Sequence, residues 1–220
     1  MMQAVVDNTF ILTTSDRRQL VFLEKSSGTI RGMLVDDAGV PIQASQLSSL
    51  KLWLHLRDDT SLPVGGINNV SNVDILNDGT RGTIGNAKTI TNVTVNPTDD
   101  DFKGRVRLNI NAHGYSDGDL IGVRGVRGVK GANGDWFLSV VDVNWVELSG
   151  SSGTGLYVSG GTAVKGMHLQ LQPNDNAIVQ NPAPAVGATE WHEAYVLATF
   201  GVKTAAVLMH FQVKNLAKAS

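Results

Sequence analysis

The chain has 220 residues, and its 18 basic and 20 acidic side chains leave a net charge of −2 at neutral pH. Cysteine is absent, which excludes a disulfide framework, thiol catalysis and Cys-ligated metal sites. The near-neutral charge argues against nucleic-acid binding by bulk electrostatics, and no apolar run approaches the ~18 residues of a membrane-spanning helix, so we expect neither nucleic acid nor membrane as a partner.

The first 17 residues are expected to form an extended arm. They hold several large apolar side chains, which a lone soluble chain would have to expose. Because full burial of one such side chain is worth ~1.5–3 kcal/mol, we expect the arm to pack on another chain. Its candidate contact residues are Val5, Val6, Phe10, Ile11 and Leu12.

Alternation of apolar and polar residues predicts strands through most of the remaining sequence. The pattern covers residues 50–57, 105–110, 167–172 and 205–214, and a further strand is expected at 29–35, before the turn at 36–39. Each strand should present one face to a core and the other to solvent or to a partner. In 50–57, for example, the leucines at even positions share one face, opposite Lys51, Trp53, His55 and Arg57. Short helical pieces are expected only at 44–49 and 174–179.

The segment 190–200 differs, because both of its faces are apolar. Trp191, Tyr195 and Leu197 lie on one face, and the other face is similarly apolar. This pattern indicates either a central strand that is covered on both sides or a contact between subunits.

The middle of the chain, residues 88–165, is richer in glycine than its flanks, and its charges balance. We interpret it as a small inserted β domain. Residues 18–87 and 166–216 would then form one discontinuous β domain around it. The sequence therefore predicts an all-β protein, with the ends of the insertion, near Gly85 and Gly166, side by side.

Glycine recurs at every third position between Gly122 and Gly134. The run is too short and too poor in proline for collagen, so we expect a strand and a glycine-rich hairpin, with Asn133-Gly134 as a tight-turn signal. Its cations, Arg124, Arg127 and Lys130, are candidates for a patch that contacts an acidic partner surface.

Motifs for catalysis or cofactors are weak. His55, His168 and His210 could hold a metal only if their strands were neighbours, and Thr98–Asp101 lacks the later ligands of a calcium loop. Phosphate-binding, nucleophile-elbow and zinc-protease patterns are missing from the sequence. We expect no enzyme, no catalytic residues, no metal and no cofactor.

A set of short motifs lies within residues ~90–163: Ala112-His113-Gly114, Gly118-Asp119, Gly125-Val126, Asn133-Gly134, Trp136-Phe137, Val140-Val141-Asp142, Glu147-Leu148, Tyr157 and Gly160-Gly161. With these motifs the segment resembles a small β module of tailed-bacteriophage virion proteins, one that is similar to the first catalytic-cysteine half-domain of ubiquitin-activating enzymes. The resemblance implies no ubiquitin chemistry, because that module does not carry the nucleophile.

The flanks carry a second set of segments, 32–42, 50–57, 169–178, 190–200 and 207–216. In these segments the flanks resemble an immunoglobulin-like domain of phage virion proteins. Together, the two resemblances imply an immunoglobulin-like β-sandwich that is interrupted by a small β-barrel-like domain.

The resemblances imply a structural virion component at the head–tail junction (neck or collar) or in the tail, made in the bacterial cytoplasm and located in the phage particle. Its expected partners are other virion proteins and further copies of itself in a ring or lattice. Capsid decoration is the nearest variant. The alternatives are a host-glycan-binding adsorption module and, as a third class, an enzyme or an unrelated binding protein. Fold analogy does not decide among these functions.

Overall fold

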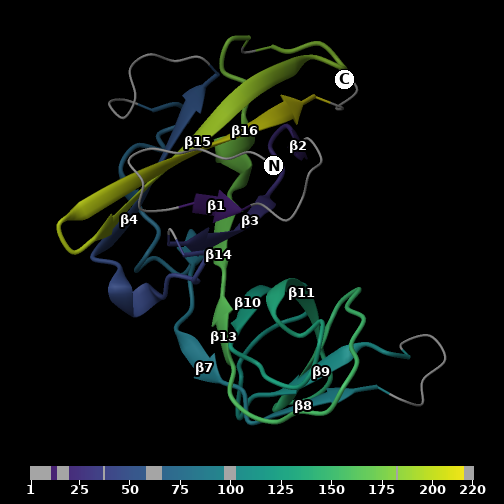
Figure 1. Cartoon of the computed structure of the whole chain (residues 1–220). Coiled ribbons are helices and arrows are strands. Elements are labelled where there is room, and N and C mark those ends of the chain that lie inside the picture. Colours follow the sequence, from purple (N-terminus) through teal and green to yellow (C-terminus); the bar gives the residue numbers. More distant parts are fainter. Residues whose placement is uncertain are drawn as a thin grey trace.

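The computed structural model describes residues 22–36, 38–57, 66–96, 103–181 and 183–215, together with the backbone of residues 11–13, 20 and 21 (Figure 1). Within this part the fold is built from strands and turns. The two short 3₁₀ helices are η1 (Ala44–Gln46) and η2 (Pro173–Asn176), at the places where short helical pieces are expected.

Two sheets form a sandwich. The four-stranded sheet has the order β1-β3-β14-β6, and all of its neighbouring strands are antiparallel. Its strands are β1 (Ile11–Thr13), β3 (Gly28–Val35), β6 (Gly82–Thr83) and β14 (Met167–Leu171).

The five-stranded sheet has the order β2-β16-β15-β4-β5. Its strands are β2 (Leu20–Leu23), β4 (Ser49–Leu56), β5 (Val73–Asp74), β15 (Thr189–Phe200) and β16 (Lys203–Lys214). The two longest strands, β15 and β16, form a hairpin around the two-residue turn Gly201-Val202, where Gly201 has a φ of +57°. A two-residue turn with positive φ matches the twist of long antiparallel strands.

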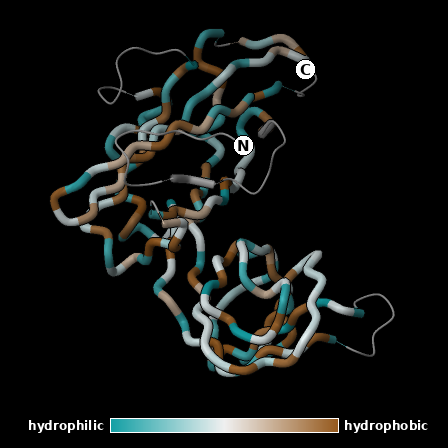
Figure 2. Tube along the Cα trace, in the orientation of Figure 1, coloured by the Kyte–Doolittle hydropathy of each residue, from teal (hydrophilic) through white to brown (hydrophobic). Residues whose placement is uncertain are grey.

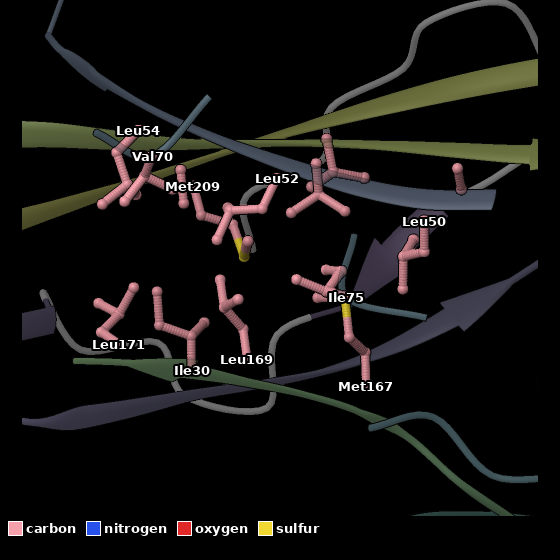
Figure 3. Close-up of a cluster of buried hydrophobic side chains, with 14 of the residues drawn as sticks. Ile30, Leu50, Leu52, Leu54, Val70, Ile75, Met167, Leu169, Leu171 and Met209 are labelled. Atoms are coloured by element: carbon pink, nitrogen blue, oxygen red, sulfur yellow. The ribbon is translucent and has the colours of Figure 1, made fainter. Parts of the chain in front are cut away.

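The sandwich core lies between these sheets. Figure 3 shows Ile30, Met167, Leu169 and Leu171 pointing from the four-stranded sheet toward side chains of the five-stranded sheet. The opposing side chains come from alternate positions of β4, β15 and β16, and include Leu50, Leu52, Leu54, Ala194, Val196, Val207, Met209 and Phe211. The period-2 alternation of the sequence therefore identifies the inward faces of these strands.

Residues 87–165 form a separate sheet of seven strands that curls into a half-barrel (Figure 1). Its strand order is β7-β13-β10-β11-β12-β9-β8. The strands are β7 (Ala87–Thr89), β8 (Asn92–Val95), β9 (Val106–Asn109), β10 (Leu120–Arg124), β11 (Gly134–Val140), β12 (Trp145–Leu148) and β13 (Thr162–Lys165).

The half-barrel has its own apolar core, centred on Leu108, Ile121, Leu138, Val146 and Leu148, all of which are fully buried. Along the trace, apolar residues alternate with polar ones in both the sandwich and the half-barrel (Figure 2). The expected fold class is therefore confirmed: the protein is all-β, with an immunoglobulin-like two-sheet sandwich and a small barrel-like β part.

The chain passes between the two parts at one place. The Gly85 amide donates a 3.1 Å hydrogen bond to the carbonyl of Lys165, and the Gly166 amide donates to the carbonyl of Leu120 at 2.8 Å. The outgoing and returning segments thus lie side by side, with Gly85 and Gly166 close together, as an inserted segment requires.

The outer face of the five-stranded sheet differs from the expected polar face. Trp53 is only 8% exposed and His55 is fully buried, although both lie opposite the inward leucines of β4. The ring of Trp53 packs edge-to-face on Tyr195 of β15, with 5.7 Å between ring centroids. Strand β15 is central in the sheet, between β4 and β16, and its outward side chains Trp191, Tyr195 and Leu197 are half-buried. A contact between subunits on this face stays a prediction.

Candidate interaction surfaces

The glycine-rich run between β10 and β11 is a three-residue structural repeat. Its inward positions are Val123, Val126, Val129 and Ala132, all buried in the half-barrel core. The intervening glycines, Gly125, Gly128 and Gly131, have φ values of +77°, +95° and +81°. Each unit therefore places one side chain in the core, one outward, and one left-handed residue that only glycine adopts without strain.

Close backbone packing also requires these glycines. A Cβ atom on Gly128 would lie 2.0 Å from the carbonyl oxygen of Leu156, and one on Gly131 would lie 2.2 Å from that of Ser152. The run pairs with the segment that follows β12, through isolated bridges from Arg127 to Ser159 and from Lys130 to Thr154.

The expected tight hairpin at Asn133-Gly134 is wrong. The Asn133 side chain accepts a hydrogen bond from the Val126 amide and donates one to the Val126 carbonyl, both at 2.9 Å. The Asn133 side chain thus joins the two ends of a wide loop that starts at Val126, and β11 begins at Gly134. The local Asn-Gly signal was overridden by contacts of the longer repeat.

The three cations of the run do not share one environment. Arg124 is partly buried, pairs with Asp135 at 2.9 Å and donates to the Gly39 carbonyl of the sandwich at 3.2 Å. Arg127 and Lys130 are exposed. Arg124 therefore contributes to the contact between the two parts, and Arg127 and Lys130 remain as the outward-facing cations.

Two exposed apolar side chains accompany these cations. Leu156 is 85% exposed and Val158 is 73% exposed, while Tyr157 between them turns inward and donates from its hydroxyl to the carbonyls of Ile90 and Gly160. The strand-like alternation forces both aliphatic side chains outward beside Gly128. We call Arg127, Lys130, Leu156 and Val158 the basic patch.

A second exposed apolar cluster lies at the β11–β12 turn. Val141 is 46% exposed and Val143 is 66% exposed, with the exposed Asp142 between them. Asp117 is also exposed, and its Oδ1 accepts a hydrogen bond from the Val140 amide at 2.6 Å, which places its carboxylate beside this turn. We call Asp117, Val141, Asp142 and Val143 the acidic patch.

A buried polar cluster joins the half-barrel to the sandwich. Asp119, at 4% exposed, accepts from the Ser116 amide at 3.0 Å and from Lys165 Nζ at 2.8 Å, and it lies 3.5 Å from Nε2 of His168. Burial lowers the pKa of His168 to about 4. The Asp119 carboxylate raises this pKa, and the charges of Lys165 and Arg31 lower it. His168 is thus neutral near neutral pH.

The three candidate metal-binding histidines do not meet. His168 lies on β14 in the four-stranded sheet, whereas His55 and His210 lie on β4 and β16. These two flank Glu193 of the central strand β15, and His210 Nδ1 is 2.8 Å from the Glu193 carboxylate. In the part of the chain that the structure describes, no three His, Asp or Glu side chains are grouped to hold a metal ion.

Two sequence-predicted sites lie largely outside the described residues. Of the arm, Ile11 and Leu12 are on β1, whose backbone pairs with Leu34 and Val35 of the same chain. Val5, Val6 and Phe10 are not described, and contact of the arm with another chain stays a prediction. The Thr98–Asp101 segment is likewise outside the described residues.

Sequence reasoning missed both apolar components of the patches. A partial signal was present: Val141 and Val143 flank an acidic residue just beyond a strand, and Leu156 and Val158 lie among glycines. It is not sufficient, because Val126 and Val129 also lie among glycines and are buried.

Comparison with known proteins gives no relative: no protein-family model matches the chain, and no curated protein matches it. None of the helices in the described part of the chain is long and apolar enough to cross a membrane.

Proposed function

We propose that this chain is a non-enzymatic structural component of a tailed-bacteriophage particle, at the head–tail junction or in the tail. The observation that supports it most is the architecture itself. A sandwich whose strands are interrupted by a barrel-like β part is the combination that the two sequence resemblances imply. Fold alone does not assign function, so the location of the chain is the decisive measurement.

The use of polar groups agrees with this role. The buried carboxylates hold the scaffold together: Glu147 pairs with Arg105 and Arg107, Asp175 pairs with Arg81, and Asp119 pairs with Lys165. Exposed apolar side chains lie beside charges at two ends of the half-barrel, and others, such as Val186 and Val202, lie on the sandwich. A component that acts by shape and repeated contacts needs a rigid scaffold and weakly binding surfaces, because multivalency raises the overall avidity ~10²–10⁴-fold above the affinity of one contact.

The test is to purify particles of the phage that encodes the chain and to locate it by quantitative mass spectrometry and particle reconstruction. We expect several copies in a symmetric ring at the neck or along the tail, in contact with other virion proteins. Absence from purified particles would overturn the proposal. Copies spread over the capsid surface would indicate decoration, and copies confined to a distal tip would indicate adsorption to host glycans.

Deletion of residues 1–17 tests the role of the arm. We predict that the truncated chain folds: it loses β1 at the edge of the four-stranded sheet but keeps the described core side chains of the sandwich and the half-barrel. Its incorporation into particles should fall, because the apolar arm side chains would no longer contact a neighbour. Circular dichroism and immunoblots of gradient-purified particles measure the two properties. Normal incorporation of the folded truncated chain would show that the arm makes no assembly contact.

A further inference from the structure

The two patches lie at opposite ends of the half-barrel. The basic patch borders the loop that precedes β11, and the acidic patch follows the last residue of β11. The strand has seven residues, so the ends are separated by roughly 20 Å at ~3.3 Å per residue. The patches of one chain therefore cannot contact each other.

The patches are complementary in composition. Each combines two exposed charges of one sign with two exposed aliphatic side chains. Arg127 and Lys130 match Asp117 and Asp142, and Leu156 and Val158 offer apolar surface to Val141 and Val143. Opposite charges at the edge of an apolar contact give orientation and specificity.

We propose that the partner of the basic patch is the acidic patch of a second copy of this chain, so that copies associate head to tail through their half-barrels. The inference rests on the proposed role as a repeated particle component and names the surfaces that repeat. Because the two surfaces differ, the contact is heterologous, and it produces a closed ring or an open filament rather than a two-fold dimer.

Nearby charges leave this pairing intact. Arg124, the third cation of the repeat, is already paired with Asp135 and faces the sandwich. Lys88, on the acidic side, donates from Nζ to the carbonyl of Ala112 and lies 6.0 Å from the ring centroid of Tyr115.

The contact should be weak for two isolated copies. Four side chains on each partner cover much less than the ~800 Å² per partner of a standard stable interface. Closure of a ring or fixation of copies on a particle would raise the overall strength without new contacts. The pairing should also weaken with salt, because its charges are exposed.

Sedimentation equilibrium of the full chain, over a concentration series to about 1 mM at low salt, tests the proposal. We expect the average mass to rise with concentration. Arg127→Glu with Lys130→Glu should weaken association by about tenfold or more, because like charges would then face each other. Asp117→Asn with Asp142→Asn should also weaken it; asparagine retains the side-chain oxygens that accept the Val140, Asn144 and Trp145 amides.

The matched control is Lys25→Glu with Lys203→Glu, which makes the same charge change at two exposed lysines of the sandwich. It should leave association unchanged. Thermal unfolding of each variant checks that the fold is retained. Association that persists in both patch variants, or a wild-type chain that is monomeric at every concentration, would overturn the proposal.

A DNA-binding measurement tests whether the basic patch binds a polyanion instead of a second copy of the chain. If the wild-type chain remained monomeric yet bound a DNA duplex, and the Arg127→Glu/Lys130→Glu variant did not, the patch would serve a polyanion and the copy-to-copy contact would be wrong. Failure of this inference is distinct from failure of the proposed function. A chain found in particles that does not self-associate contradicts only the former, and a self-associating chain absent from particles contradicts only the latter.

Discussion

Gly128 is the most restricted glycine of the three-residue repeat. Its φ is +95°, and a Cβ atom would lie 2.0 Å from the Leu156 carbonyl oxygen. We predict that Gly128→Ala lowers the free energy of unfolding by ~3 kcal/mol, because the left-handed backbone costs ~1–2 kcal/mol and the neighbouring backbone must also move. Urea unfolding followed by tryptophan fluorescence measures the loss.

Gly104 is a control for the backbone part of this cost. Its φ is +82°, but a Cβ atom there would meet nothing within 4 Å. Gly104→Ala should therefore cost only ~1 kcal/mol. Equal losses in the two variants would contradict the view that close packing on the 152–159 segment selects glycine.

At the residue scale, the sequence shows the period of the repeat but not which of its side chains face the core. Glycine at every third position is visible, and so are the cations that follow each valine. That Val126 and Val129 are inward while Arg127 is outward depends on left-handed glycines and on pairing with residues some 30 positions later. Long-range backbone contacts of this kind leave no local signature in one sequence.

His168 should make stability pH-dependent. Burial lowers its pKa to about 4, with Lys165 and Arg31 acting in the same direction and Asp119 opposing them. The unfolded chain binds a proton near pH 6.5, whereas the folded chain resists it until about pH 4. The part of the unfolding free energy that depends on neutral His168 is therefore fully present above pH 6.5, and it is lost as the pH falls from 6.5 toward 4.

We expect His168 to account for about 2 kcal/mol of this loss, after allowance for its partial exposure. Unfolding free energies of wild type and His168→Gln, measured between pH 7.5 and 4, provide the test. The variant should show a shallower fall. Burial also lowers the pKa of His192, so part of the dependence should remain in the variant. Identical pH profiles would refute the role of His168.

At the scale of elements, alternation located the strands but not their neighbours. The inward faces of β4, β14 and β16 follow directly from period 2. The burial of Trp53 and His55 on the outer face does not, because it depends on β15 lying beside β4. Strand order is set by contacts between residues far apart in sequence, and a single sequence does not reveal them.

Glu147 joins two neighbouring strands of the half-barrel. It lies on β12, is 4% exposed, and accepts from Arg107 Nε at 2.9 Å and from Arg105 Nη1 at 3.2 Å. Glu147→Ala should lower the free energy of unfolding by about 2 kcal/mol, because two arginines lose a buried acceptor. Chemical denaturation measures the change.

The partly exposed ion pair between Lys51 and Asp74, at 3.5 Å, serves as the comparison. Lys51→Met removes the cation of this pair, and ion pairs near the surface contribute at most ~1 kcal/mol. A Glu147→Ala loss as small as that of Lys51→Met would mean that the buried pair does not hold β9 to β12.

At the scale of the whole molecule, the sequence indicated an insertion from its composition, but it could not supply the junction. There the apolar contact is made by Met33 and Val35 of β3 with Leu120 of β10. Gly122 and Gly166 allow the two parts to approach: a Cβ on Gly166 would lie 2.7 Å from the Gly32 carbonyl oxygen. These residues are unremarkable in sequence, because their role arises only when the two parts are in contact.

Gly122 provides the test of that contact. Its φ is outside the left-handed range, so a side chain is tolerated by the backbone, but a Cβ atom would lie 2.6 Å from Cγ of Pro41 and 3.2 Å from Cε of Met33. Gly122→Leu should therefore push the half-barrel from the sandwich while each core stays folded. The junction amides of Gly85 and Gly166 should then exchange with solvent deuterium faster, because their hydrogen bonds to Lys165 and Leu120 lie at the crossing.

Two references make this exchange measurement decisive. Amides of the central strands β11 and β15 report on the two cores and should keep their protection in Gly122→Leu. Gly79→Leu is the matched variant, since a Cβ at Gly79 meets nothing within 4 Å, and it should leave the junction amides unchanged. Faster exchange throughout both cores would indicate general unfolding, and unchanged junction amides would show that the packing of Gly122 on Pro41 does not hold the two parts together.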